Sequence, residues 1–116
     1  MSTGETIGPK RIVWLHSEIK TPPFALESRL EAGILLRRLQ VGDILAMPES
    51  RPMPSVGKSC HELRVRDAAH NWRIVYRIDH NAIIVAGIFA KKTPRTPKVE
   101  IDQCKSRLKR YDDRKP

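Results

Sequence analysis

The 116-residue sequence is poor in cysteines, in aromatic side chains and in long apolar runs. Its two cysteines, Cys60 and Cys104, have no CxxC partner and no histidine at ligand spacing, so neither a disulfide nor a zinc site is favoured. We expect both to be reduced residues that pack in the interior, and we expect no metal site. No apolar run approaches the roughly 20 residues of a membrane span, so we expect no membrane partner.

The N-terminus, MSTGETIGPKR, also lacks the apolar core and the cleavage pattern of a signal peptide. We therefore expect a cytoplasmic protein. The length is that of one small domain covering residues 1–116, of which residues 1–10 are expected to be flexible. With 40% hydrophobic and 30% charged residues, the composition is that of a globular chain.

Positive charge is what the sequence has in excess. It contains 22 Lys and Arg against 13 Asp and Glu, which gives a net charge of +9. Residues 91–116 carry 10 basic and 4 acidic groups, so two thirds of the net charge lies in this tail. Such an excess predicts a polyanionic partner, and the alternative is a charged surface that only keeps the protein soluble.

The first half of the chain predicts a strand, a helix and a connector. Residues Arg11–His16 form a short run that favours a strand. Thr21 and Pro22 are suited to open a helix that ends near Gly42. Residues 47–59 contain three prolines and predict an irregular connector across the surface. The apolar stripe expected of the helix consists of Leu26, Leu30, Ile34, Leu36 and Leu39.

The stretch ELRVRDAAHNWRIVYRI, residues 62–78, alternates apolar and charged side chains in two runs separated by a polar loop. Because side chains along a strand alternate between faces, the pattern predicts a hairpin with one apolar and one cationic face. Tyr76 falls on the apolar face, where we expect it to pack. Four arginines form the cationic face: Arg64, Arg66, Arg73 and Arg77.

The last part of the chain predicts an inner strand and a basic helix. Residues 82–90 are continuously apolar, which is typical of a strand covered on both faces, and we expect it beside the arginine-bearing strand. Thr96 and Pro97 are suited to start the C-terminal helix. Its expected apolar stripe consists of Ile101, Cys104, Leu108 and Tyr111.

The arginine face has two interpretations. The arginines could pair with the neighbouring carboxylates of Glu62, Asp67 and Asp79, as cross-strand partners do. Alternatively they bind phosphate, because guanidinium groups match phosphate oxygens with two hydrogen bonds and rigid strands hold them in place. The second interpretation makes an RNA or DNA backbone the natural ligand.

Three segments carry a resemblance to a known family. RPMPSVGKSCHELRVRD, WRIVYRI and GIFAKKTPRTPKVEID resemble the phage-derived, host-inhibition (HigB-like) branch of the RelE/ParE/HigB toxin superfamily. The resemblance extends from about Val13 to Tyr111. It implies a small α+β fold, with an N-terminal strand and helices packed on a twisted, mainly antiparallel sheet and a basic C-terminal helix. The order of elements predicted from the residues agrees with this fold.

The resemblance also implies an activity. Members of the superfamily are toxins of type II toxin–antitoxin systems, and many are ribosome-dependent endoribonucleases that cut mRNA, known as mRNA interferases. In their reaction the RNA 2′-hydroxyl attacks the adjacent phosphorus, which requires no metal and no cofactor. The implied partners are mRNA on the ribosome and a cognate antitoxin, usually a small DNA-binding protein.

Residue roles follow from the same resemblance. Arg73 matches an arginine expected to stabilise the transition-state phosphate, and Arg64 matches a basic position on the preceding strand. Lys92 would support the leaving group. His61 is either an acid–base group or a turn residue. The residues expected to bind RNA are Arg66, Arg77, Lys91, Arg95 and Lys98. The tyrosine that other branches place near the C-terminus has no match here.

Two other functions remain open at the level of sequence. One is a non-catalytic growth inhibitor that binds a host protein, as the gyrase-directed branch of the superfamily does. The other is a basic nucleic-acid-binding module without toxicity. The sequence has only six aromatic residues, which counts against the module because single-stranded RNA is usually bound by stacking aromatics.

Overall fold

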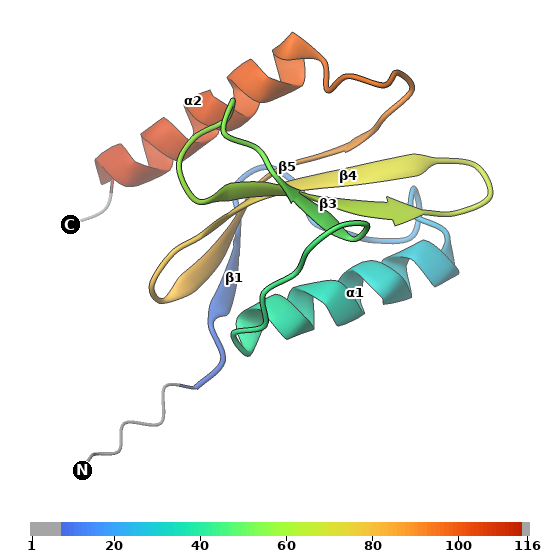
Figure 1. Cartoon of the computed structure of the whole chain (residues 1–116), viewed down its shortest axis with the longest axis horizontal. Coiled ribbons are helices and arrows are strands. Elements are labelled where there is room, and N and C mark those ends of the chain that lie inside the picture. The colour runs from blue at the N-terminus through green and yellow to red at the C-terminus, as the bar shows by residue number, and fades with distance from the viewer. Residues whose placement is uncertain (1–7, 115–116) are drawn as a thin grey trace.

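The computed structural model describes residues 8–114, and in this part of the chain five strands form one sheet with a helix on each face. The chain order is β1 (Arg11–Trp14), α1 (Leu26–Gln40), β2 (Ser50–Pro52), β3 (Cys60–Arg66), β4 (Asn71–Ile78), β5 (Ala82–Ala90) and α2 (Lys98–Arg114) (Figure 1). The strand order in the sheet is β1-β5-β4-β3-β2, with β1 parallel to β5 and all other pairs antiparallel. The expected α+β fold is confirmed.

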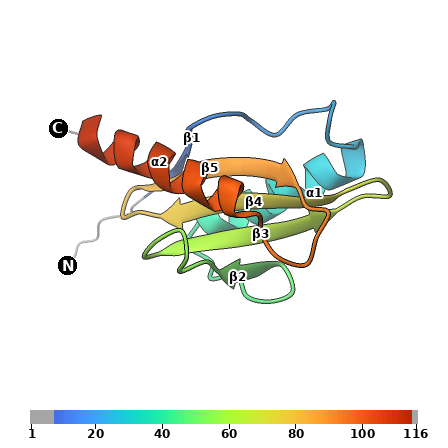
Figure 2. The same ribbon diagram turned by 90° about the horizontal axis from the view of Figure 1, so that it is seen from above.

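The sheet is buried on both faces because a helix covers each of them (Figure 2). On the α1 side, Leu63, Ile74 and Val85 are buried against the helix. On the α2 side, the buried residues include Val75 and Ile84. The β5 strand contributes to both cores, as the continuously apolar sequence predicted, and it lies beside the arginine-bearing β4. The hairpin of β3 and β4 is also confirmed.

The first strand is shorter than expected and lies at one edge of the sheet. It ends at Trp14, two residues before the predicted His16. Just before it, the Lys10 amide donates to the Gln40 carbonyl and the Lys10 ammonium donates to the Asp79 carbonyl, at 2.8 and 2.9 Å. Most of the segment expected to be flexible, residues 1–7, lies outside the described residues.

The predicted start of α1 was wrong by about five residues. The helix begins at Leu26 and not at Thr21, because a residue before a proline is driven out of the helical region and two prolines follow Thr21. The helix ends as predicted near Gly42, which has a φ of +95°. The residues of α1 that face the sheet form one stripe: Ser28, Ala32, Leu35, Leu36 and Leu39.

The predicted apolar stripe of α1 was right for only part of its length. Leu36 and Leu39 are buried as expected, but Leu26, Leu30 and Ile34 are more than half exposed. The helix turns the small Ser28 and Ala32 toward the sheet instead, because Phe24 and Trp72 stack at 4.0 Å and fill the space there. A row of apolar side chains thus remains on the surface.

The segment 47–59, expected to be an irregular connector, contains the short strand β2. Ser50 and Arg51 pair with Leu63 and Glu62 of β3. Pro52 is tolerated because β2 is the edge strand, where a missing backbone N–H costs no ladder hydrogen bond. Met53 and Val56 are buried rather than spread over the surface.

The C-terminal helix and the cysteines match the expectation. The helix starts directly after Pro97, and its stripe packs on the sheet through Cys104 and Leu108. Cys60 and Cys104 are both free and buried, and burial raises the pKa of the Cys104 thiol to about 11. Between residues 8 and 114, neither helix is long and apolar enough to cross a membrane.

Candidate nucleic-acid interface

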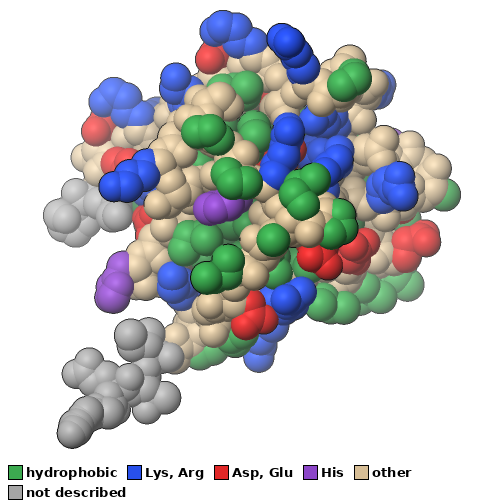
Figure 3. All heavy atoms as spheres, in the orientation of Figure 1, with side chains coloured by type: hydrophobic (Ala, Val, Ile, Leu, Met, Phe, Trp, Pro, Cys, Tyr) green, Lys and Arg blue, Asp and Glu red, His purple; other side chains and the backbone are tan. Residues whose placement is uncertain are grey.

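Basic side chains gather where α2 leaves one end of the sheet uncovered. They come from β2, β3, β4 and the segment after β5, and they surround a hollow of about 420 Å³. A neighbouring hollow of about 600 Å³ shares Arg64, Asn71 and Arg73 with the first. We call the two together the basic groove, defined by Arg51, Arg64, Arg66, Arg73, Lys91 and Lys92. Figure 3 shows Lys and Arg side chains gathered over β3 and β4 on this face.

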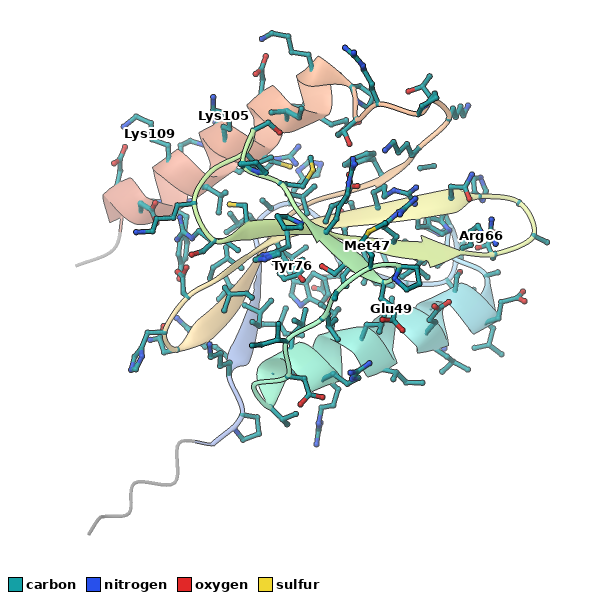
Figure 4. The ribbon with its side chains drawn as sticks, in the orientation of Figure 1. Met47, Glu49, Arg66, Tyr76, Lys105 and Lys109 are labelled. Carbon is teal, nitrogen blue, oxygen red and sulfur yellow. The ribbon has the colours of Figure 1, made fainter. Side chains whose placement is uncertain are left out.

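The rim of the groove is formed by the β3 end and the segment before β2. Arg66 is exposed, and Arg64 lies next to Met47, with its Nη1 3.6 Å from the Met47 sulfur. Glu49 lines the larger hollow. Figure 4 shows Arg66, Met47 and Glu49 along this side of the sheet. The groove thus has a polar, open mouth.

A buried carboxylate organises the floor of the groove. Glu62 has no exposed surface, and its Oε1 accepts a hydrogen bond from Arg51 Nε at 3.0 Å. Its Oε2 accepts one from the Thr96 hydroxyl at 2.9 Å. Arg73 Nε lies 3.5 Å from the same Oε1, which makes an ion pair. One carboxylate therefore holds two arginines, one from each side of β3.

Arg73 is the most buried cation of the groove. Only 8% of its surface is exposed, and its Nη1 donates to the Trp72 carbonyl at 3.0 Å, whereas its Nε has no hydrogen-bond partner among the described residues. Burial lowers the pKa of Arg73 and the Glu62 charge opposes this effect. An arginine keeps its proton in spite of such a shift. Arg73 is therefore a fixed positive charge at the groove floor.

Lys91 is the other buried cation of the groove. It is 8% exposed, and its backbone N–H donates to the Asn71 carbonyl at 2.7 Å. Burial lowers the pKa of the Lys91 ammonium, and the charges of Arg51, Arg73 and Arg64 lower it as well, against the effect of Glu62. A lysine in this position gives up a proton more readily than one in water.

Comparison with known protein families decides where the chain belongs. The sequence matches the family described as Phage derived protein Gp49-like (DUF891) over residues 24–109, which is 86 of its 116 residues. The chain belongs to this Gp49-like family. The family is a RelE/HigB-like toxin family, which is consistent with a toxin-like function. A search of curated proteins found no match to the chain.

All six groove residues of this Gp49-like protein lie within the matched range. Of the residues expected to be catalytic, the structure brings Arg73, Arg64 and Lys92 together, with Lys92 exposed at the rim. His61 lies on the other face of β3, where its ring stacks on Tyr76 at 5.4 Å. Tyr76 is buried as expected, with its hydroxyl 2.6 Å from that of Ser50.

Only some of the residues expected to bind RNA lie in the basic groove. Arg66 and Lys91 belong to the groove, whereas Arg77 lies at the far end of β4 and forms ion pairs with Asp79 and Asp112 at 2.7 and 2.8 Å. These two carboxylates hold the Arg77 pKa above its ordinary value, so this arginine joins β4 to α2. Its guanidinium is occupied, which agrees with the ion-pair interpretation of that one arginine.

Arg95 and Lys98 lie beyond the groove of the Gp49-like chain. Arg95 is exposed and lines a separate hollow together with Arg51. Lys98 is exposed on the first turn of α2 and pairs with Asp102 at 2.8 Å. Neither side chain lines the two hollows that contain Arg73.

Sequence reasoning missed two residues of the site. Arg51 was not predicted to belong to the site, because the proline-rich segment around it has no strand pattern in the sequence. Glu62 was considered only as one of three possible ion-pair partners, and its burial between two arginines depends on β2, which was not predicted. Asp67 pairs with none of the four arginines, because its carboxylate accepts hydrogen bonds from Ser28, Trp72 and the β3–β4 turn.

Across residues 8–114, no group of three or more His, Cys, Asp or Glu side chains lies close enough to hold a metal ion. What the arrangement can do is bind a phosphodiester, stabilise extra negative charge on it through Arg73 and exchange a proton through Lys91.

Proposed function

We propose that this chain is the toxin of a type II toxin–antitoxin system, of the host-inhibition branch, and that it cuts mRNA bound to the ribosome in the cytoplasm. Cleavage proceeds by attack of the RNA 2′-hydroxyl on the adjacent phosphorus, without a metal or a cofactor. The products are a cyclic phosphate on one fragment and a free 5′-hydroxyl on the other. The observation that carries the proposal is Arg73, an almost fully buried arginine that lines an open groove together with the buried Lys91.

Each groove residue has a role in this reaction. Arg73 donates to the phosphate oxygens as negative charge builds up in the transition state. Arg64 and Arg66 hold the neighbouring phosphates of the RNA backbone. Lys91 exchanges a proton with the reacting oxygens, and Lys92 stabilises the leaving 5′-oxygen by its charge. His61 has no role here because it lies on the other face of the sheet.

The partner that controls such a toxin is a cognate antitoxin. A small DNA-binding protein is the expected kind, because proteins of this kind repress their own operon and neutralise the toxin. Its binding is a separate property from RNA cleavage, and the two can be tested apart.

The deciding experiment is primer extension on a defined mRNA in a reconstituted translation reaction. The wild-type chain, Arg73→Ala and Arg110→Ala are compared, with and without ribosomes. Arg110 serves as the matched control because it lies on α2, outside the basic groove, and its side chain donates to the Ser106 hydroxyl of the same helix. We expect ribosome-dependent cuts that fall about 10²–10³-fold in Arg73→Ala and persist in Arg110→Ala. Uncut mRNA with the wild-type chain would refute the proposal.

A second candidate is a non-catalytic inhibitor that binds a host protein. It is favoured by the positions of His61 and Tyr76, which leave the groove without a histidine or tyrosine among the residues that line it. In that case expression would arrest growth while mRNA stayed intact, and Arg73→Ala would remain toxic. A basic module without toxicity would bind RNA and leave growth unaffected.

A further inference from the structure

The outer side of α1 carries apolar side chains that this chain leaves uncovered. Leu30 and Ile34 are 55% and 63% exposed, and Leu26 continues the row at the same spacing of four residues. Leu30 and Ile34, together with the edge strand, bound a hollow of about 740 Å³, which we call the α1 groove. Its apolar lining consists of Ile12, Trp14, Ile19, Leu30, Ile34 and Leu36.

The α1 groove lies on the other face of the sheet from Arg64 and Arg73, although Glu31 of α1 lines the larger hollow of the basic groove. Ile12 and Trp14 pack against the core on the α1 side, whereas Arg64 and Arg73 alternate along their strands with Leu63 and Ile74 of that core and so lie on the opposite face. The β1 strand at its margin is an edge strand, with β5 as its neighbour in the sheet.

A glycine in the middle of α1 points to close approach by another molecule. Gly33 lies in the lining of the α1 groove, and no atom lies within 4 Å of the place where its Cβ would be. Glycine weakens a helix relative to alanine, and the fold described here has no steric need for it at this position. A helix packed against α1 would use the missing side chain, because small residues let two helices approach closely.

The rim of the α1 groove is positively charged. Arg29, Arg37 and Arg38 line it, and of these Arg38 pairs with Asp43 at 3.1 Å. Arg29 and Arg37 have no ion-pair partner among the described residues. The natural occupant therefore has an apolar face flanked by carboxylates. A second copy of this chain fits poorly, because each copy has a net charge of +9.

We propose that the α1 groove binds an acidic amphipathic helix of a partner protein. The row of Leu26, Leu30 and Ile34 forms a ridge at the spacing that interlocks with a second helix. The proposal deepens the function proposed above, because an antitoxin is the partner which that function requires. Binding at this place leaves the basic groove open, so such a partner would not act by occupying the Arg73 site.

The test uses a fluorescein-labelled peptide of about 18 residues, long enough to form a helix, with leucines at heptad spacing and glutamates elsewhere. A scrambled peptide of the same composition controls for charge. Binding to the full chain is measured by fluorescence anisotropy for the wild type, Ile34→Ser and Val99→Ser. Val99 is the matched control, since it is an apolar side chain 58% exposed on α2.

We expect the helical peptide to bind at least tenfold more weakly to Ile34→Ser than to the wild type or Val99→Ser. Gly33→Trp, which fills the α1 groove, is expected to weaken binding by a similar factor. Amide NMR shifts should map to β1 and α1. Equal binding of the scrambled peptide, equal binding by Ile34→Ser, or shifts around Arg64 and Arg73 would each overturn the proposal. A wild-type dimer that Ile34→Ser disrupts would assign the groove to a second copy instead.

The outcome is separable from that of the proposed function. Ile34→Ser leaves every residue of the basic groove unchanged, so its cleavage of ribosome-bound mRNA should equal that of the wild type. Peptide binding that depends on Ile34 in a chain that cuts no mRNA would refute the proposed function alone. Normal cleavage together with peptide binding that does not depend on Ile34 would refute the docking proposal alone.

Discussion

Arg73 and Glu62 form the least ordinary contact in the protein, because a fully buried carboxylate faces two arginines of which one is itself almost buried. A buried ion pair contributes little net stability, since the loss of solvation offsets the attraction. The effect of this ion pair is on the geometry of the groove. Glu62 fixes the directions of Arg51 and Arg73 at the groove floor.

The first prediction concerns Glu62 as a positioning residue. Glu62→Gln keeps the size of the side chain but removes the charge that orients both arginines. We expect kcat for mRNA cleavage to fall by about 10²-fold, because a small misplacement of a catalytic group has an effect of this size, while KM changes much less. Single-turnover kinetics at saturating and limiting mRNA would separate the two constants.

Glu49→Gln is the matched control for this variant. Glu49 lines the groove, and the described residues include no ion-pair partner for it, so the control should cut mRNA at least as well as the wild type. A purely structural role for Glu62 would lower the thermal stability and leave kcat per folded molecule unchanged. That result would contradict the positioning role.

The second prediction concerns the proton carried by Lys91. Lys91→Arg retains a positive charge but cannot release a proton at ordinary pH. We expect it to bind RNA as the wild type does and to cut it about 10²–10⁴-fold more slowly, which is the usual contribution of general acid–base catalysis. Filter binding and primer extension on the same preparations would measure both quantities.

The pH dependence of the cleavage rate tests whether Lys91 is the group that exchanges the proton. Because burial and the neighbouring arginines lower the pKa of Lys91, its proton is lost below the ordinary lysine value of 10.5. The wild-type rate should therefore change at a pH below that value, where Lys91 loses its proton. A profile of the same shape in Lys91→Arg would assign the proton transfer to another group.

At the scale of elements, replacing glycine by alanine should change the free energy of unfolding in opposite directions at two positions. Gly33→Ala should raise the free energy of unfolding by about 0.5–1 kcal/mol, because alanine favours the helix and its Cβ meets no atom within 4 Å. Gly87→Ala should lower it by about 1–3 kcal/mol, because the new Cβ would lie 2.7 Å from Cys104 Sγ. Urea unfolding of both variants would measure the difference, and equal signs would contradict the packing of α2 on β5.

The helices and strands could be predicted where a single local rule acts. Alternation placed Arg64, Arg66 and Arg73 on one face of the hairpin, and Pro97 located the start of α2 to within one residue. The α1 face could not be predicted in the same way. Two apolar stripes compete on that helix, and the choice between them depends on Phe24 and Trp72, which come together only in the folded chain.

The sequence was enough to predict which residues of β3 and β4 belong to the candidate site. It was not enough to predict which residues from other parts of the chain join them. The pattern of β3 and β4 identified Arg64 and Arg73. Arg51 and the burial of Glu62 depend on β2, a strand of three residues that ends in proline and has no sequence pattern of its own. Lys91 was expected only to bind RNA, because its burial follows from contacts at the end of β5 that the sequence does not encode locally.

At the scale of the whole molecule, the distribution of charge along the chain differs from its distribution in space. Two thirds of the net charge lies in residues 91–116, yet two of the cations there are neutralised within α2, where Lys98 pairs with Asp102 and Lys109 with Asp113. The basic groove, in contrast, gathers six cations that are drawn from four separate parts of the chain. Binding should therefore follow the groove and not the tail.

The last prediction tests this with salt. Each phosphate of single-stranded RNA that a cation neutralises contributes about −0.7 to the slope of log K against log salt concentration. If four groove cations bind phosphates, the slope for a short RNA is about −3, and Arg66→Ala should make it less negative by about 0.7. Lys109→Ala, which removes an exposed cation already paired with Asp113 on α2, should leave the slope unchanged. Equal changes in the two variants would mean that RNA responds to total charge, and the groove would then have no special part in binding.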